Sequence, residues 1–107
     1  MKTNLGEFEE IVLLLVAAQH GEAYGLSITT TIETDLKRPV TLSSVHTALY
    51  RLEEKGFVES AYGGTSKHRG GRRKRLFSIT TLGKAALRQA RDARDLLWNM
   101  IPKFVME

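Results

Sequence analysis

The chain has 107 residues, a formal net charge of +4 and 42% hydrophobic residues. This length and composition suit one globular domain with one core and argue against wholesale disorder. The absence of cysteine excludes disulfides and thiolate chemistry, and the longest apolar run, Ile11–Ala18, is far shorter than the roughly 20 residues that span a bilayer.

The first predicted helix begins near Asn4 and ends near Gln19. Asn4 can cap this helix, and Glu7 follows three residues later, as a capping box requires. Apolar residues then recur every three or four positions and predict one buried face: Leu5, Phe8, Val12 and Leu15. The acidic start of the chain does not fit a signal peptide, so we expect a cytoplasmic protein with no membrane partner.

The segment from Tyr24 to Leu36 is ambiguous. Ile28, Ile32 and Leu36 are spaced one helical turn apart, which predicts a second helix. Five consecutive β-branched residues from Ile28 to Ile32 favour a strand instead, and no good N-cap precedes Tyr24. We favour a helix because of the element that follows, and we expect it to end before Pro39.

The segment from Thr41 to Lys55 is the clearest predicted helix. Thr41 suits its N-cap, Gly56 suits the left-handed position after its end, and a core face is predicted at Leu42, Val45, Leu49 and Leu52. A short break around Arg38–Val40 gives the layout of a helix-turn-helix, in which the second helix reads DNA mainly with its N-terminal half. The opposite face therefore supplies the predicted recognition residues, which are Ser43, Ser44, His46, Thr47, Tyr50 and Arg51. For His46 and Tyr50, a surface position without DNA contact is an equal alternative.

A hairpin is predicted next. Its first strand covers Phe57–Tyr62 and is ended by Gly63-Gly64, and its second strand covers Arg75–Thr80. Nine basic residues and no acidic one lie between Ser60 and Arg91, and six of the nine fall within Lys67–Arg75. A basic hairpin directly after a recognition helix indicates a wing that neutralises DNA phosphates, with some side chains entering the minor groove. The predicted wing residues are Lys67, Arg69, Gly70, Gly71, Arg72, Arg73 and Lys74. A solvated loop is the alternative for this run, and Arg75 has the alternative of an ion pair with a carboxylate such as Glu59.

A long final helix is predicted to start at Thr80 or Thr81 and to end near Ile101, because Pro102 cannot continue it. Its apolar seam resembles that of a coiled coil and predicts a dimer contact through Ala86, Ala90, Ala93, Leu97, Met100 and Phe104. Packing of the seam onto its own domain is the alternative. The predicted fold is mostly α, in the α+β class, with a winged helix-turn-helix in residues 1–80 and a dimerisation helix in residues 81–107.

Five short motifs along the chain recur together in one known family. They are Leu5-Gly6-Glu7-Phe8-Glu9, Glu22-Ala23-Tyr24-Gly25, the run from Leu49 to Val58, Gly70-Gly71-Arg72-Arg73-Lys74 and Ile79-Thr80-Thr81-Leu82-Gly83. With them the chain resembles the PadR family of bacterial transcriptional regulators. The resemblance implies a winged helix-turn-helix, a C-terminal helix for homodimerisation, and operator binding, usually repression, relieved by a small molecule such as a phenolic compound or a drug.

Two positions depart from the family pattern. The family usually has tyrosine, often a DNA contact, where His46 stands. The family's short members place a tryptophan on the last helix against flat ligands, whereas Trp98 lies about one turn further along. Trp98 is therefore a candidate effector residue, and a buried interface tryptophan is the alternative.

We therefore expect a homodimeric repressor that binds a pseudo-palindromic operator in double-stranded DNA and is released by a small aromatic ligand. The alternative is a ligand sensor or protein-interaction module whose basic hairpin binds an acidic partner. RNA binding is less favoured, because a wing is expected to lack the exposed aromatic platform of single-strand readers. No enzyme, metal or other cofactor is expected, since the three histidines fall in separate elements and no residues have metal-ligand spacing.

Overall fold

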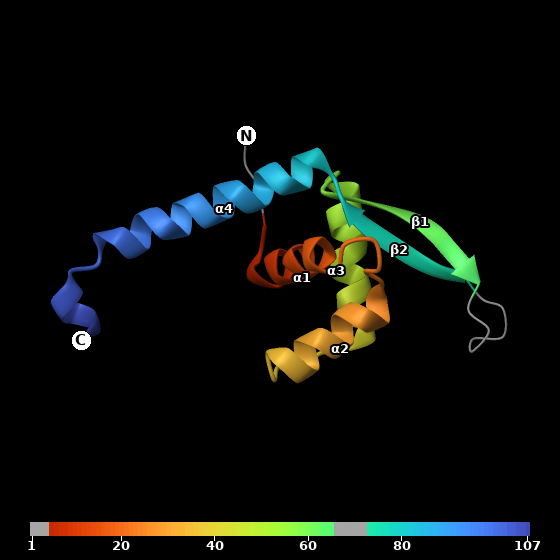
Figure 1. Ribbon diagram of the computed structural model, residues 1–107, viewed down its shortest axis with the longest axis horizontal. Helices are drawn as coiled ribbons and strands as arrows, with labels where there is room; N and C mark the ends of the chain where they lie inside the picture. The colour runs from red at the N-terminus through yellow and green to blue at the C-terminus, as the bar shows by residue number, and fades with distance from the viewer. Residues whose placement is uncertain (1–4, 66–72) are drawn as a thin grey trace.

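The computed structural model describes residues 5–65 and 73–107 and is built mainly of helices (Figure 1). In chain order its elements are α1 (Glu7–Ala18), α2 (Gly25–Asp35), α3 (Leu42–Glu54), β1 (Val58–Thr65), β2 (Arg73–Ile79), α4 (Thr81–Met100) and a short 3-10 helix, η2 (Lys103–Met106). Three helices followed by an antiparallel hairpin and a long helix confirm the predicted fold class. In the part of the chain that the structure describes, no helix is both long and apolar enough to cross a membrane.

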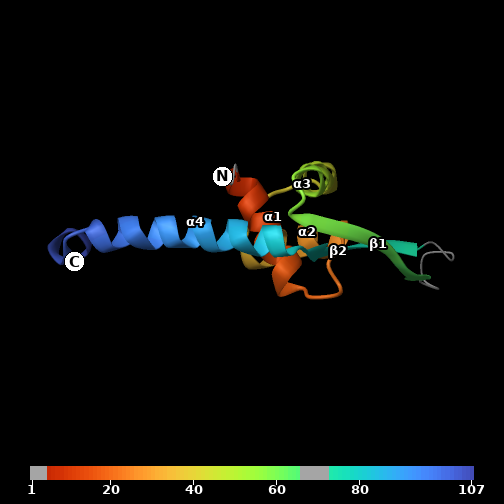
Figure 2. The same ribbon diagram turned by 90° about the horizontal axis from the view of Figure 1, so that it is seen from above.

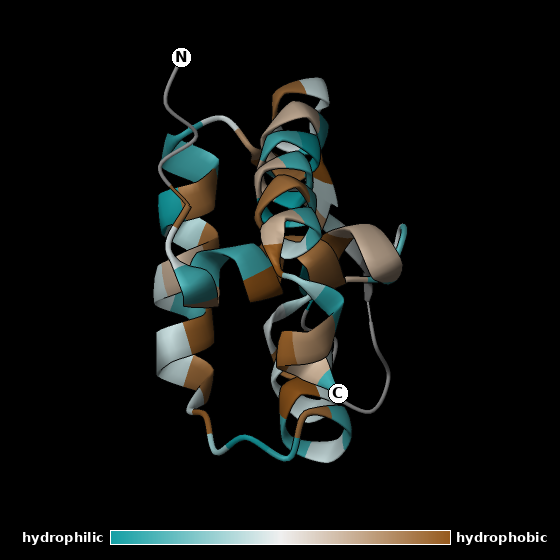
Figure 3. Cartoon of the chain, turned by 90° about the vertical axis from the view of Figure 1, so that its left-hand side faces the viewer, coloured by the Kyte–Doolittle hydropathy of each residue, from teal (hydrophilic) through white to brown (hydrophobic). Residues whose placement is uncertain are grey.

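The core lies where α1, α2 and α3 meet. Its largest fully buried side chains are Leu13, Ile28, Ile32, Leu49, Leu52, Val12, Val16 and Val45. Each helix carries both hydrophobic and hydrophilic residues (Figure 3), so one face can pack while the other meets water. In α2 and α3 these buried positions follow the helical periodicity that the sequence predicts.

Helix α1 differs from its prediction at its start and on its buried face. The predicted cap, Asn4, lies outside the described residues, and the helix begins at Glu7 after Gly6 in an extended conformation. Val12 is buried as predicted, but Leu5, Phe8 and Leu15 are only half-buried against the core. The remaining buried positions belong to Leu13 and Val16, because α1 packs against helices on two sides.

The ambiguous segment is a helix, as predicted, in spite of its β-branched residues. The side chain of Ser27 replaces the missing N-cap, because its Oγ accepts a hydrogen bond from the backbone N–H of Tyr24 at 3.0 Å. The Gln19 side chain donates to the Thr31 hydroxyl at 3.1 Å and accepts from the Ser27 hydroxyl at 2.6 Å. These bonds satisfy polar groups at the start of α2, and burial of Ile28 and Ile32 outweighs the weak helix propensity of β-branched residues.

Helix α3 matches its predicted bounds. Thr41 Oγ1 accepts a hydrogen bond from the backbone N–H of Ser44 at 3.0 Å, and Gly56 follows the helix with φ +80°. Val45, Leu49 and Leu52 are buried as predicted, whereas Leu42 is 42% exposed. Ala48 is buried in addition, so the core face of α3 begins one turn later than the leucine pattern indicates.

The hairpin is longer than predicted. Strand β1 continues through Gly63 and Gly64 to Thr65, and β2 already begins at Arg73. A Cβ at Gly63 would lie 2.7 Å from Cδ1 of Leu76, so glycine there lets the two strands stay close instead of ending the strand. An irregularity in the register between Tyr62 and Thr65 accommodates this stretch. The backbone N–H of Phe77 also donates to the Ala23 carbonyl at 2.8 Å, which ties the hairpin to the loop before α2.

Helix α4 leaves the domain and extends away from it (Figures 1 and 2). Thr80 is its N-cap and accepts from the backbone N–H of Gly83 at 3.0 Å. The helix ends at Met100, with Ile101 as the C-cap before Pro102, as predicted. The described chain is consequently elongated, with extents of 57 × 32 × 20 Å.

Candidate nucleic-acid interface

The exposed face of α3 carries most of the predicted recognition residues. Ser43, Ser44, Thr47, Tyr50 and Arg51 are exposed, on the side opposite to the buried Val45, Ala48, Leu49 and Leu52. The Thr47 hydroxyl donates to the Ser43 carbonyl at 3.0 Å, and the Ser44 hydroxyl donates to the Thr41 carbonyl at 2.8 Å. Both hydroxyls keep acceptor lone pairs for an outside donor. This face is therefore polar and accessible, and hydrogen bonds orient the side chains of Ser44 and Thr47.

His46 is half-buried rather than fully presented on this face. It lies against the start of α2, where a Cβ at Gly25 would come within 2.1 Å of its Nε2 atom. Its ring centroid is 6.0 Å from that of Tyr50, at an interplanar angle of 30°. The absence of a side chain at Gly25 therefore makes room for the imidazole, which explains the glycine of the sequence motif in terms of packing.

Two of the predicted wing residues, Arg73 and Lys74, lie on strand β2 and not in the loop at the hairpin tip. Lys74 Nζ lies 4.6 Å from the centroid of the Tyr24 ring, within the range of a cation–π contact. The other predicted wing residues lie outside the described residues: Lys67, Arg69, Gly70, Gly71 and Arg72. The strand position of Arg73 and Lys74 corrects the prediction, and its reason is the extension of β1 across its glycines.

Arg75 has an internal role in the structure. Its guanidinium donates to Oε1 of Glu53 at 2.8 Å and to Oγ of Ser60 at 3.0 Å. The same group lies 5.3 Å from the centroid of Tyr50 and 5.5 Å from that of Phe77. The alternative of an ion pair was thus the right one, but the partner is Glu53 on α3 and not Glu59. Arg75 fastens the wing to the recognition helix.

A groove of about 260 Å³ lies between α3, the start of α2 and the hairpin. Its lining combines aromatic rings with cationic side chains and includes Tyr24, His46, Tyr50, Tyr62, Arg73 and Lys74. Tyr50 and Tyr62 are 46% and 65% exposed. Sequence analysis missed Tyr24 and Tyr62. The only signal for Tyr24 was its place in a motif, and Tyr62 had none.

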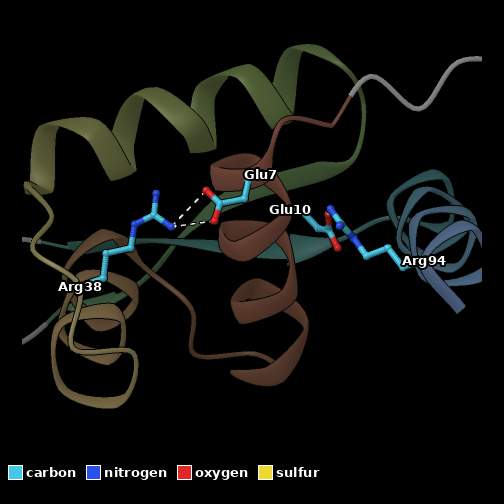
Figure 4. A network of polar contacts seen from close by, with 4 residues as sticks. All are labelled: Glu7, Glu10, Arg38 and Arg94. Atoms are coloured by element: carbon cyan, nitrogen blue, oxygen red, sulfur yellow. Dashed lines mark hydrogen bonds and ion pairs between the residues drawn. The ribbon is translucent and has the colours of Figure 1, made fainter. Parts of the chain in front are cut away.

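Ion pairs hold α3 to α1 at both of its ends. Before the helix, Arg38 donates from Nη1 to both carboxylate oxygens of Glu7, at 3.0 and 3.1 Å (Figure 4). This hydrogen bond lowers the pKa of Glu7 and raises that of Arg38. After the helix, Lys55 Nζ lies 2.6 Å from Oε1 of Glu9. These contacts fix the orientation in which α3 presents its exposed face.

The predicted seam on α4 is only partly exposed. Ala86 is 1% exposed and belongs to the core of its own chain, because the first turns of α4 pack against α1. Ala90 is half-buried, whereas Ala93, Leu97 and Met100 are exposed. Phe104 lies on η2, beyond Pro102, and so is not in the helical register of the other residues. The exposed seam is therefore shorter than the sequence pattern indicates.

Trp98 is 60% exposed and lies at the end of a groove between α1 and α4. The groove has a volume of about 480 Å³ and is lined by Glu10, Leu14, Leu87, Arg88, Arg91, Arg94, Asp95 and Trp98. Across it, Arg94 donates to Oε1 of Glu10 at 3.0 Å, and Figure 4 shows these residues bridging α4 and α1. Among residues 5–65 and 73–107, no cluster of three or more acidic or histidine side chains could hold a metal ion.

A helix-turn-helix joined to an antiparallel hairpin, with a polar face on its second helix, defines a winged helix-turn-helix protein. Residues 12–89 match the family model described as "Transcriptional regulator PadR-like family". The chain therefore belongs to the PadR-like family of transcriptional regulators, which confirms the resemblance seen in the sequence.

Solved structures agree with this assignment. A PadR-like regulator from Bacillus cereus has a TM-score of 0.74 at 17% identity, over 94% of this chain and 92% of that chain. A transcriptional regulator from Clostridium thermocellum has a TM-score of 0.68 at 26% identity, over 91% and 88%. Bacillus subtilis PadR, solved in complex with operator DNA, has a TM-score of 0.66 at 19% identity, over 90% of this chain and 48% of that longer one. No curated protein sequence matches the chain.

Proposed function

We propose that this protein is a sequence-specific DNA-binding repressor that acts in the cytoplasm as a homodimer. The observation that carries the proposal is the exposed polar face of α3 beside a cationic strand. A helix of this kind fits the major groove of B-DNA, and the adjacent cations suit the phosphate backbone. The complex of Bacillus subtilis PadR with operator DNA supports DNA as the partner of this chain.

Base contacts and phosphate contacts are made by two different groups of residues. On α3, base contacts fall to Ser43, Thr47 and Arg51, with Ser44, His46 and Tyr50 at the edge of the contact. Arg51 can donate two parallel hydrogen bonds to guanine, whereas serine and threonine hydroxyls can bond with several bases. Phosphate contacts are made by Arg73 and Lys74 on β2 and by the wing residues Lys67, Arg69 and Arg72. Gly70 and Gly71 allow the backbone of the wing to approach the DNA closely. Phosphate contacts fix position and affinity, and base contacts fix sequence preference.

A dimer would place two copies of α3 on one face of the duplex. Half-sites about 34 Å apart, one turn of B-DNA, then require a pseudo-palindromic operator. The exposed residues Ala93, Leu97 and Met100 of α4 supply an apolar surface for this association. Release by a small aromatic ligand is part of the proposal, and the groove beside Trp98 is its proposed binding place.

The test is binding of the purified protein to its own promoter region and to unrelated DNA over a series of salt concentrations. We expect a specific complex, and a log affinity that falls steeply with log salt, because each phosphate contact releases a counterion. Lys74→Ala should reduce the salt slope by about 1, whereas Lys84→Ala on α4 removes one positive charge elsewhere and should leave the slope unchanged. Equal affinity for promoter and unrelated DNA would contradict the proposal.

A second function, binding of an acidic partner by the basic hairpin, predicts a different result. Arg73→Ala combined with Lys74→Ala would then leave DNA retention unchanged. The exposed face of α3 has no role in this second function, so Arg51→Ala would also leave DNA retention unchanged.

A further inference from the structure

Leu42 is an exposed apolar side chain at the start of α3. It is the first residue of the helix and directly follows the N-cap, Thr41. It is 42% exposed and lies outside the buried core, although the apolar spacing of the sequence predicts a core position. Because the side chains of a helix tilt toward its N-terminus, Leu42 covers the end of α3 that a recognition helix directs at base edges.

The charge around Leu42 suits a polyanion. Leu42 lines the groove between α3, the start of α2 and the hairpin, next to His46, and Arg73 and Lys74 line the same groove from β2. Among the residues that the structure describes, no acidic side chain lines this groove. Leu42 is an apolar side chain in a cationic groove, so the part of the polyanion that it contacts should itself be apolar.

Thymine is the base that carries a methyl group on its major-groove edge. The other groups on the major-groove edges that proteins read are hydrogen-bond donors and acceptors. The neighbouring hydroxyls of Ser43 and Thr47 can bond with several bases, so they discriminate only weakly. A leucine beside them supplies a preference that a hydroxyl cannot, because burial of a methyl group against it is favourable.

We propose that Leu42 is a specificity-determining residue that contacts the C5 methyl group of one thymine in each half-site of the operator. The methyl group packs against the isobutyl side chain of Leu42, and both lose their contact with water. Burial of one methyl group strengthens binding by a factor of about 4, so two half-sites together contribute about 15-fold. The inference rests on the DNA binding and the homodimer of the proposed function, and it adds the base that the start of α3 reads.

Deoxyuridine in place of thymidine tests the contact, because it removes the methyl group and keeps the hydrogen-bonding groups of the base. Selection of bound duplexes from a random library by the purified full chain first supplies the site. Each thymidine is then replaced in turn, at symmetric positions of both half-sites, and the affinity is measured at one salt concentration. We expect the parent chain to lose about 15-fold in affinity at one symmetric pair of positions.

Two leucine variants assign this loss to Leu42. Leu42→Ala should bind the thymidine and deoxyuridine duplexes of that pair with equal affinity. Leu26→Ala is the matched control, because Leu26 lies at the start of α2, is 44% exposed and lines the same groove. The first helix of a helix-turn-helix crosses the DNA backbone and does not read bases, so Leu26→Ala should keep the full loss.

A parent chain that binds every deoxyuridine duplex as tightly as the thymidine duplex overturns the proposal, and this measurement needs no variant. A loss that is equally large in Leu42→Ala also overturns it, because the methyl group then acts through the shape of the DNA or through another residue. Selection that enriches no sequence overturns the proposed function together with this inference. That failure is distinguishable, because an enriched site without an effect of the methyl group leaves the proposed function intact.

Discussion

Replacing Arg75 with alanine tests whether this residue of the basic hairpin stabilises the fold instead of contacting DNA. Both residues line the groove, but Arg75 is hydrogen-bonded to Glu53 and Ser60, whereas Lys74 lies over the Tyr24 ring. Arg75→Ala should therefore lower the free energy of unfolding, and Lys74→Ala should weaken DNA binding with little change in stability. The two substitutions each remove one positive charge from adjacent positions of one strand, so each serves as the control for the other.

The size of the effect follows from the contacts of Arg75. A hydrogen bond to a charged group contributes roughly 1.5–3 kcal/mol when shielded, but a pair this exposed, with side chains 37% and 32% accessible, must be discounted for screening by solvent. The contacts with the faces of Tyr50 and Phe77 add roughly 0.5 kcal/mol at exposed sites. We expect a total loss of about 1–2 kcal/mol, which for a domain of this size corresponds to a fall of about 4–16 °C in the thermal midpoint.

Urea unfolding of four proteins measures this loss and assigns it to the pair: the parent chain, Arg75→Ala, Glu53→Ala and the double variant. Because the two side chains contact each other, the double variant should lose less than the sum of the single losses, by about 0.5 kcal/mol or more. Additive losses would refute the pairing. An unchanged unfolding midpoint in Arg75→Ala, combined with the same loss of DNA affinity as in Lys74→Ala, would show that Arg75 is a DNA contact after all.

Three further substitutions test how the recognition helix is held. Gly25→Ala should destabilise the fold by about 1 kcal/mol, because its methyl group displaces the His46 ring, and adding His46→Ala should restore the thermal midpoint; no recovery would argue against the contact. Thr41→Ala removes the N-cap of α3 and should cost about 1 kcal/mol in urea unfolding, whereas Thr41→Ser, which keeps the hydroxyl, should cost little. Arg38 lowers the pKa of Glu7 in the fold, so this pair stabilises the protein above the ordinary pKa of glutamate and loses its effect as the pH falls below it. Thermal midpoints measured between pH 6 and pH 3 should therefore converge for the parent chain and Glu7→Gln at the acidic end, and a constant difference would contradict the linkage.

Local sequence signals were sufficient for the elements that carry their own start and stop residues. Helix α3 has a capping threonine, a regular apolar spacing and a terminal glycine, and it was predicted almost to the residue. The start of α2 was not predictable in this way, since Ser27 caps from inside the helix and is held by Gln19 from another element. The β-branched run is helical because Ile28 and Ile32 reach a core that only the tertiary fold provides.

The sequence was sufficient to predict the two segments of the candidate site, α3 and the hairpin, but not the surface that they form together. The exposed face of α3 follows from periodicity, whereas the lining of the groove by Tyr24 and Tyr62 depends on how the hairpin folds back. Glycines in the sequence indicated the end of β1, and in the structure Gly63 instead lets the strand continue past Leu76. Ala86 fits the pattern of the exposed seam equally well, and only packing against α1 assigns it to the core.

The central claim, that α3 reads sequence while the hairpin supplies affinity, is tested most directly by competition between promoter DNA and unrelated DNA at one fixed salt concentration. The parent protein should prefer the promoter site by a factor of at least about 10³, the lower end of what specific DNA-binding proteins reach. Arg51→Ala should lose most of that preference and keep its affinity for unrelated DNA, and Lys74→Ala should weaken binding to both DNAs alike. A parent protein without preference, or an Arg51→Ala variant as selective as the parent, would contradict the claim.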